Sequence, residues 1–138
     1  MRIELLDHQG RDAVPLAWLR RVACCAAARL GIRQAGRLSV VFLDRATMRA
    51  LNRRFARHDR LTDVLSFRYP GEPIIGEILV APASARLYAR AHRRSYRDEL
   101  ARYVIHGLLH WVGHDDKTPA QQRKMRAMED RLLAQCAR

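Results

Sequence analysis

Residues 95–116 read SYRDELARYVIHGLLHWVGHDD, the pattern of one amphipathic helix followed by a turn. Ser95 and Asp98 have the spacing of a capping box, in which a serine hydroxyl accepts from a backbone N–H of the first turn. Gly113 stands where a glycine commonly ends a helix in the left-handed conformation. Apolar residues recur every three or four positions on one face, at Leu100, Val104, Leu108 and Trp111. The segment therefore predicts a helix buried on one side.

Two histidines lie on a different face of this helix. His106 and His110 are four residues apart, so their side chains stack about one turn from each other. Two imidazoles at that separation can both reach one Zn²⁺ at about 2.0–2.1 Å. The glycine turn then brings His114, Asp115 and Asp116 back toward the same ion. We predict a metal site here; two surface histidines followed by an acidic turn are the alternative.

The rest of the sequence predicts alternating strands and helices in a single domain over residues 1–138. The expected fold class is α+β, with one mixed β-sheet of about four strands backed by helices. The metal site is expected at the end of a helix in the C-terminal half. The expected strands are residues 3–6, 38–43, 64–67 and 77–80. The expected helices are residues 14–30, a second helix whose N-terminus is capped by Asp44, and three helices after Pro82, which are separated near residues 93–94 and at residues 113–119.

The charge of the chain favours a polyanionic partner. Lysine and arginine number 26 against 14 acidic residues, which gives a formal net charge of +12. Such a charge attracts nucleic acid through its phosphates. No apolar run approaches the roughly 20 residues of a membrane span, so no membrane partner is expected. The N-terminal sequence MRIELLDHQGRD has acidic residues where a signal peptide is apolar, which predicts a cytoplasmic protein.

The three cysteines form no metal-binding or disulfide pattern. Cys24 and Cys25 are adjacent, Cys136 lies near the end, and the sequence has no C-x-x-C. In a reducing cytoplasm, thiols of this kind are expected to be small buried hydrophobic side chains without disulfides.

Three segments together resemble the YbeY family of metal-dependent endoribonucleases: HGLLHWVGHDD (residues 106–116), LNRRFARHDRLTDVLSF (residues 51–67) and GEILVAP (residues 76–82). The resemblance covers essentially the whole chain. It implies an α+β fold with one Zn²⁺ per chain in a cleft. It also implies cleavage of single-stranded RNA in ribosomal RNA maturation and ribosome quality control, with ribosomal RNA or a ribosomal subunit as partner. The sequence does not indicate an oligomeric state.

The chain departs from the family at the third metal ligand. The family has a histidine ten residues after the first one, where this chain has Asp116. A carboxylate can also bind zinc, at about 2.0–2.2 Å, so we expect His106, His110 and Asp116 to be the ligands. A carboxylate also admits Mn²⁺ or Fe²⁺ more readily than a third imidazole. His114 is the alternative third ligand.

A second departure concerns an arginine. Family members commonly carry arginine directly after the aromatic residue of the second segment, where this chain has Ala56. Arg57 is the candidate catalytic replacement, and Arg57, Arg60 and Ser66 are candidates for substrate binding. Asp115 is the candidate for orienting a ligand imidazole through a hydrogen bond. The family's prolines beside the TDVLSF sequence are replaced by Leu61 and Arg68.

The expected mechanism uses a water molecule bound to the metal as nucleophile, because zinc lowers the pKa of such a water toward about 7. Two alternatives are a small zinc peptidase and a non-catalytic RNA- or ribosome-binding protein with a structural metal. Position 107 is glycine, where an H-E-x-x-H peptidase needs glutamate as general base, and this argues against the peptidase.

Overall fold

The computed structural model describes residues 1–55, 63–71 and 73–138. Its element order agrees with the order predicted from the sequence. The strands are β1 (Arg2–Asp7), β2 (Arg37–Phe42), β3 (Val64–Arg68) and β4 (Ile74–Val80). The helices are α1 (Leu16–Arg29), α2 (Arg45–Phe55), α3 (Pro82–Ala91), α4 (Tyr96–Trp111) and α5 (Pro119–Cys136).

The strands form one mixed sheet in the order β1-β2-β4-β3. Strands β1, β2 and β4 run parallel, with Leu5 opposite Val40 and Val40 opposite Ile78. Strand β3 is antiparallel to β4 and forms an edge of the sheet, with Val64 opposite Val80. The predicted α+β class with one mixed sheet is confirmed.

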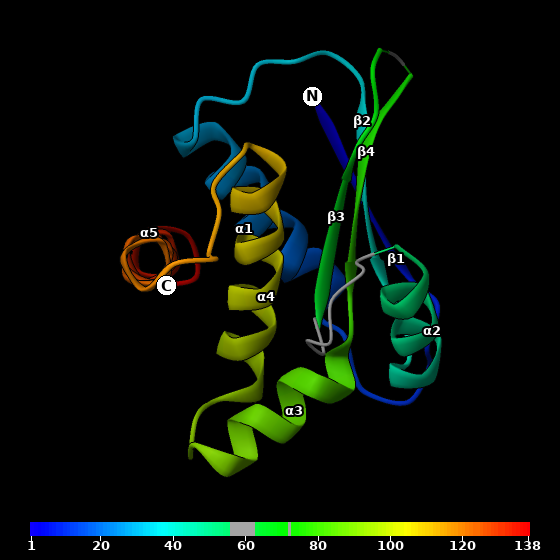
Figure 1. The fold of residues 1–138 in the computed structure, drawn as a ribbon, viewed down its shortest axis with the longest axis vertical. Coiled ribbons are helices and arrows are strands. Elements are labelled where there is room, and N and C mark those ends of the chain that lie inside the picture. The colour runs from blue at the N-terminus through cyan, green and yellow to red at the C-terminus, as the bar shows by residue number, and fades with distance from the viewer. Residues whose placement is uncertain (56–62, 72) are drawn as a thin grey trace.

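Helices cover both faces of the sheet (Figure 1). Helices α1, α4 and α5 lie on one side, and α2 lies on the other. Alternate strand residues supply the two cores, because successive side chains point to opposite faces. Val40, Ile78 and Val80 pack in the larger core against α1, α4 and α5. The smaller core, on the side of α2, contains Val41, Met48, Leu65, Leu79 and Ala81.

Local sequence explains where several helices begin. The Ser95 hydroxyl accepts from the Asp98 backbone N–H at 3.2 Å, as the spacing predicted. Thr118 and Gln121 form a complete capping box at the start of α5. At α2 the Asp44 carboxylate accepts from the Thr47 backbone N–H at 2.7 Å. That hydrogen bond favours the ionised carboxylate and lowers the pKa of Asp44.

Strand β4 is longer than the sequence predicted, because it begins at Ile74 rather than at residue 77. The hairpin stays paired beyond the expected strand end, with Gly76 opposite Arg68 and the Tyr69 N–H donating to the Ile75 carbonyl at 3.0 Å. A side chain at Gly76 would collide with the indole of Trp111. The glycine therefore lets α4 approach the sheet closely, whereas in the sequence it interrupts the apolar strand pattern.

The expectation for the cysteines is wrong. Cys25 and Cys136 form a disulfide between α1 and α5, and Cys24 is exposed. The two bonded residues are 111 positions apart, and only the packing of the last helix beside the first brings them together. Neighbouring residues on a helix point about 100° apart, so Cys24 points elsewhere.

We predict that this link stabilises the oxidised protein. It closes a long loop, and a disulfide of this kind typically contributes about 2–4 kcal/mol by restricting the unfolded chain. In urea unfolding under non-reducing conditions, Cys25→Ser/Cys136→Ser should lower the free energy of unfolding by that amount. Cys24→Ser is the matched control and should have no effect. Equal midpoints for the double variant and the control would contradict the prediction.

No helix in the described part of the chain is long and apolar enough to cross a membrane.

Candidate metal centre

Helix α4 presents His106 and His110 together on one face. Their Nε2 atoms lie 3.0 Å apart, and the two rings meet edge to face with centroids 4.5 Å apart. The opposite side of α4 is buried, including the predicted stripe of Leu100, Val104, Leu108 and Trp111. The histidine side chains are 23% and 27% exposed. The pair is thus fixed by the packed helix but open to a ligand from solution.

The turn after α4 returns a carboxylate to these histidines. Gly113 has a φ of +107°, and the His114 N–H donates to the Leu109 carbonyl at 3.0 Å, which closes the end of the helix. The Gln122 amide donates to the Asp116 backbone carbonyl at 3.1 Å and ties the turn to α5. The Asp116 Oδ2 atom then lies 3.5 Å from His106 Nε2 and 3.4 Å from His110 Nε2.

These three donor atoms have the spacing of ligands around one tetrahedral ion. Ligand atoms about 2.0–2.1 Å from such an ion lie about 3.3 Å from one another. The three donor atoms in the structure are separated by 3.0, 3.4 and 3.5 Å. Among the described residues, His106, His110 and Asp116 form the one group of this kind. Two imidazoles and a carboxylate, with a fourth position left over, are a donor set found in catalytic zinc sites.

Glu129 of α5, which was not among the residues predicted from the sequence, contacts the same site. Its Oε2 lies 2.7 Å from His106 Nδ1, and its Oε1 accepts from Arg102 at 2.9 Å. The side chain is buried, on the helix face that also carries Met125, Leu132 and Leu133. In the sequence, Glu129 occupies a position of the apolar stripe of α5. This position could have marked it as a buried, paired carboxylate, because acidic groups are rarely buried unless they are paired.

Arg102 is the cation that compensates for this buried acid. It also donates to Asp130 at 2.7 Å and lies 3.8 Å from the buried Glu99. Burial alone acts to lower the pKa of Arg102, but hydrogen bonds to Asp130 and Glu129 outweigh that effect and raise it. The guanidinium therefore stays charged between the helices.

Gly107 shows why a peptidase-type glutamate is absent beside His106. A Cβ at this position would collide with Ile78 and lie 3.1 Å from the Val64 Cγ1 atom. Helix α4 lies directly on the sheet here, and the Ser66 hydroxyl donates to the Gly107 carbonyl at 2.8 Å. The α4 face at position 107 therefore has no room for the side chain of a general base. The hydrogen bond from Ser66 holds the helix against β3.

The other predicted site residues lie at or beyond the edge of this cluster. Asp115 forms an ion pair with Lys117 at 3.9 Å, and both side chains are largely exposed. His114 is half-buried in the turn and is not part of the three-donor group. Arg57 and Arg60 lie outside the described residues.

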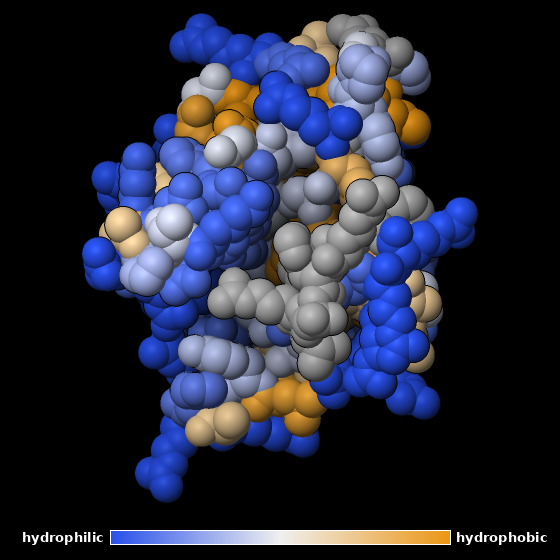
Figure 2. Space-filling view, in the orientation of Figure 1, coloured by the Kyte–Doolittle hydropathy of each residue, from blue (hydrophilic) through white to orange (hydrophobic). Residues whose placement is uncertain are grey.

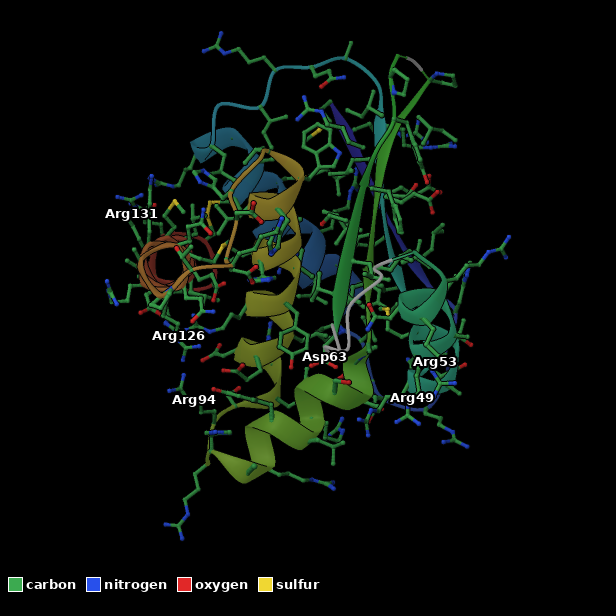
Figure 3. All side chains as sticks on the ribbon, in the orientation of Figure 1. Arg49, Arg53, Asp63, Arg94, Arg126 and Arg131 are labelled. Atoms are coloured by element: carbon green, nitrogen blue, oxygen red, sulfur yellow. A yellow bond between two sulfur atoms is a disulfide. The ribbon has the colours of Figure 1, made fainter. Side chains whose placement is uncertain are left out.

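Several elements of the fold carry exposed arginines. Figure 3 shows Arg126 and Arg131 on α5, Arg94 before α4, and Arg49 and Arg53 on α2. The same face is predominantly hydrophilic in the space-filling view (Figure 2).

Fold and site together define an α+β protein with a candidate divalent-metal centre. The solution structure of TM1509 from Thermotoga maritima has the same fold, with a TM-score of 0.62, 24% identity, and coverage of 96% of this chain and 90% of that one. The sequence model of the family described as Endoribonuclease YbeY matches residues 7–137. The chain belongs to this family, and the resemblance found in its motifs is confirmed.

Curated relatives carry the same description, Endoribonuclease YbeY. The protein of Anaeromyxobacter sp. is 36% identical, over 96% of this chain and 70% of its own length. That of Phocaeicola vulgatus is 32% identical, over 85% of this chain and 82% of its own length. The relative in Myxococcus xanthus is 34% identical over 96% of this chain, which spans about half of that longer protein (47%).

Proposed function

We propose that this protein cleaves single-stranded RNA endonucleolytically in ribosomal RNA maturation, with one divalent metal ion per chain. The observation that carries the proposal is the convergence of His106 Nε2, His110 Nε2 and Asp116 Oδ2 at ligand spacing in a chain of the endoribonuclease YbeY family. Ribosomal RNA or a ribosomal subunit is the proposed partner, in maturation and in ribosome quality control, which implies a cytoplasmic place of action.

The proposed roles follow from the contacts of each residue. His106 and His110 bind the ion through Nε2, and Asp116 binds it through Oδ2. A divalent ion held there would lower the pKa of a coordinated water and offset negative charge at a phosphate. The Ser66 hydroxyl holds α4, and with it both histidines, against the sheet. Arginines on α2 and α5 attract the RNA backbone, as we also propose for Arg57 and Arg60.

Zinc is the proposed ion, and Mn²⁺ or Fe²⁺ are the alternatives. Two imidazoles and one carboxylate suit all three ions chemically. Tetrahedral spacing of the donor atoms favours zinc, whose sites are usually four-coordinate.

The two competing functions have less support. A zinc peptidase would need a general base beside His106, and a side chain at Gly107 would collide with Ile78. A purely structural metal is normally enclosed by four protein ligands. Three donors converge within the described part of the chain, which favours an ion with an open position.

The test of the proposal is a cleavage assay with metal-stripped protein. We expect cleavage of an unstructured RNA after addition of Zn²⁺ or Mn²⁺, weaker cleavage of the same sequence in a duplex, and no cleavage of an unstructured peptide. A chelator should stop the reaction. If the peptide is cut while the RNA stays intact, the peptidase alternative replaces the nuclease.

We also predict that binding of single-stranded RNA weakens steeply with salt. Each neutralised phosphate contributes about 0.7 to the slope of log K against log salt on single strands. Arg126→Ala/Arg131→Ala should therefore reduce the slope measured by fluorescence anisotropy relative to the wild type, because both side chains are exposed on α5. A flat dependence for the wild type would argue against RNA as the partner.

A further inference from the structure

The carboxylate of Glu129 uses its two oxygens for two different partners. Oε1 accepts from the Arg102 guanidinium at 2.9 Å, and Oε2 lies 2.7 Å from His106 Nδ1. Glu129 and Arg102 are only 5% and 9% exposed, so solvent offers little competition for these contacts. Helix α5 thereby reaches the imidazole on the side opposite to the candidate metal.

For a neutral His106 imidazole, the donor and acceptor chemistry of these groups allows one arrangement of protons. Arginine has donors only and stays charged, and an ionised carboxylate has acceptors only. His106 must therefore donate from Nδ1 to satisfy Glu129. A neutral imidazole carries a single N–H, so its Nε2 then has a free lone pair. That lone pair faces Asp116 and His110 Nε2, which is where a metal would bind.

We propose that Glu129 is a positioning residue that fixes the tautomer of His106, with Arg102 holding the carboxylate in place. The inference rests on the metal site of the proposed function and adds a residue that acts through His106 rather than on the metal or the RNA. A histidine bound to metal commonly donates its other ring N–H to a carboxylate, which fixes the tautomer and the ring orientation.

Glu129→Gln makes a sharp test, because it keeps the shape of the side chain but replaces one acceptor by a donor. Arg102 can only donate, so the amide oxygen should turn toward it. The amide NH₂ then faces His106 Nδ1, which must become an acceptor. His106 should change to the tautomer protonated at Nε2, the nitrogen proposed to bind the metal.

Asp130→Asn is the matched control. Asp130 is the next residue on α5 and accepts from the same guanidinium at 2.7 Å, and its side chain is 58% exposed. The contact to His106 Nδ1 belongs to Glu129. A variant that merely weakens the Arg102 ion pair should therefore behave like Asp130→Asn, and a variant that alters the tautomer should not.

The experiment has two readouts, neither of which uses activity. Long-range ¹H–¹⁵N NMR of the metal-free full chain, well above the usual histidine pKa of about 6.5, reports the tautomer of His106. Competition titration with a zinc-binding dye reports the affinity for Zn²⁺. We expect Nδ1–H in the wild type and in Asp130→Asn, and Nε2–H in Glu129→Gln. Zinc affinity should fall about 10–100-fold in Glu129→Gln and stay unchanged in Asp130→Asn.

Three results would overturn the inference: Nε2–H in the metal-free wild type, an unchanged tautomer in folded Glu129→Gln, or equal losses of zinc affinity in the two variants. The wild-type spectrum decides the first point even if Glu129→Gln does not fold. If the wild type binds no zinc, the zinc ion of the proposed function is contradicted instead. The spectra of the metal-free protein would still confirm or reject control of the tautomer by Glu129.

Discussion

Replacement of both His106 and His110 by alanine is expected to reduce the metal content of the purified protein from about one ion per chain to none. The two side chains supply two of the three converging donors. Asp116 alone would be a single carboxylate in a surface turn. RNA cleavage should fall by far more than the roughly 10–100-fold that is typical when a hydrogen-bond partner of a metal ligand is lost.

The fold should survive this double substitution. Neither histidine belongs to the larger core, and both side chains are partly exposed. Circular dichroism should therefore match that of the wild type, while elemental analysis shows the loss of the ion. His8→Ala/His92→Ala is the matched control, since both of these histidines are exposed. Full metal occupancy in His106→Ala/His110→Ala would mean that the metal lies elsewhere.

Local patterns in the sequence were sufficient for most of the fold. The stripe from Leu100 to Trp111, the Ser95 cap and the Thr118 capping box are all features of residues within one or two helical turns. They are set by the 3.6-residue period and by the unsatisfied N–H groups of the first turn. The position of β4 in the middle of the sheet depends on long-range pairing, which such patterns do not contain.

The same distinction separates the parts of the site. His106, His110 and Asp116 lie within one helix and its following turn, so spacing alone could bring them together. Glu129 comes from another helix, and its contact with His106 exists only because α5 packs on α4. The disulfide between Cys25 and Cys136 was missed for the same reason.

Glycine at position 107 is required by the packing of α4, and it also affects the chemistry that the site can perform. From the sequence alone, Gly107 indicated only that the glutamate of an H-E-x-x-H peptidase is absent. In the fold it is the point where α4 rests on Val64 and Ile78, and its carbonyl accepts from Ser66. The glycine that allows the helix to pack against the sheet is therefore also the reason why the site has no peptidase-type base.

Asp116→Ala is expected to reduce both zinc affinity and RNA cleavage far more than His114→Ala does. Asp116 places a carboxylate oxygen 3.4–3.5 Å from the two histidine nitrogens, as the third corner of a ligand set. His114 contributes its backbone N–H to the helix end, a role that alanine retains. The loss for Asp116→Ala should exceed the roughly 10–100-fold typical of residues that only support a ligand.

Asp116→His is expected to retain or raise activity, because it restores the histidine that the family resemblance implies at this position. An imidazole nitrogen can bind zinc at about 2.0–2.1 Å in place of the carboxylate oxygen. The change also removes one negative charge, so the preference for Zn²⁺ over Mn²⁺ should increase. Zinc and manganese titrations of the wild type, Asp116→Ala, Asp116→His and His114→Ala, together with their cleavage rates, measure all of these effects. If His114→Ala loses more zinc affinity and activity than Asp116→Ala, His114 is the third ligand and the carboxylate has only a supporting role.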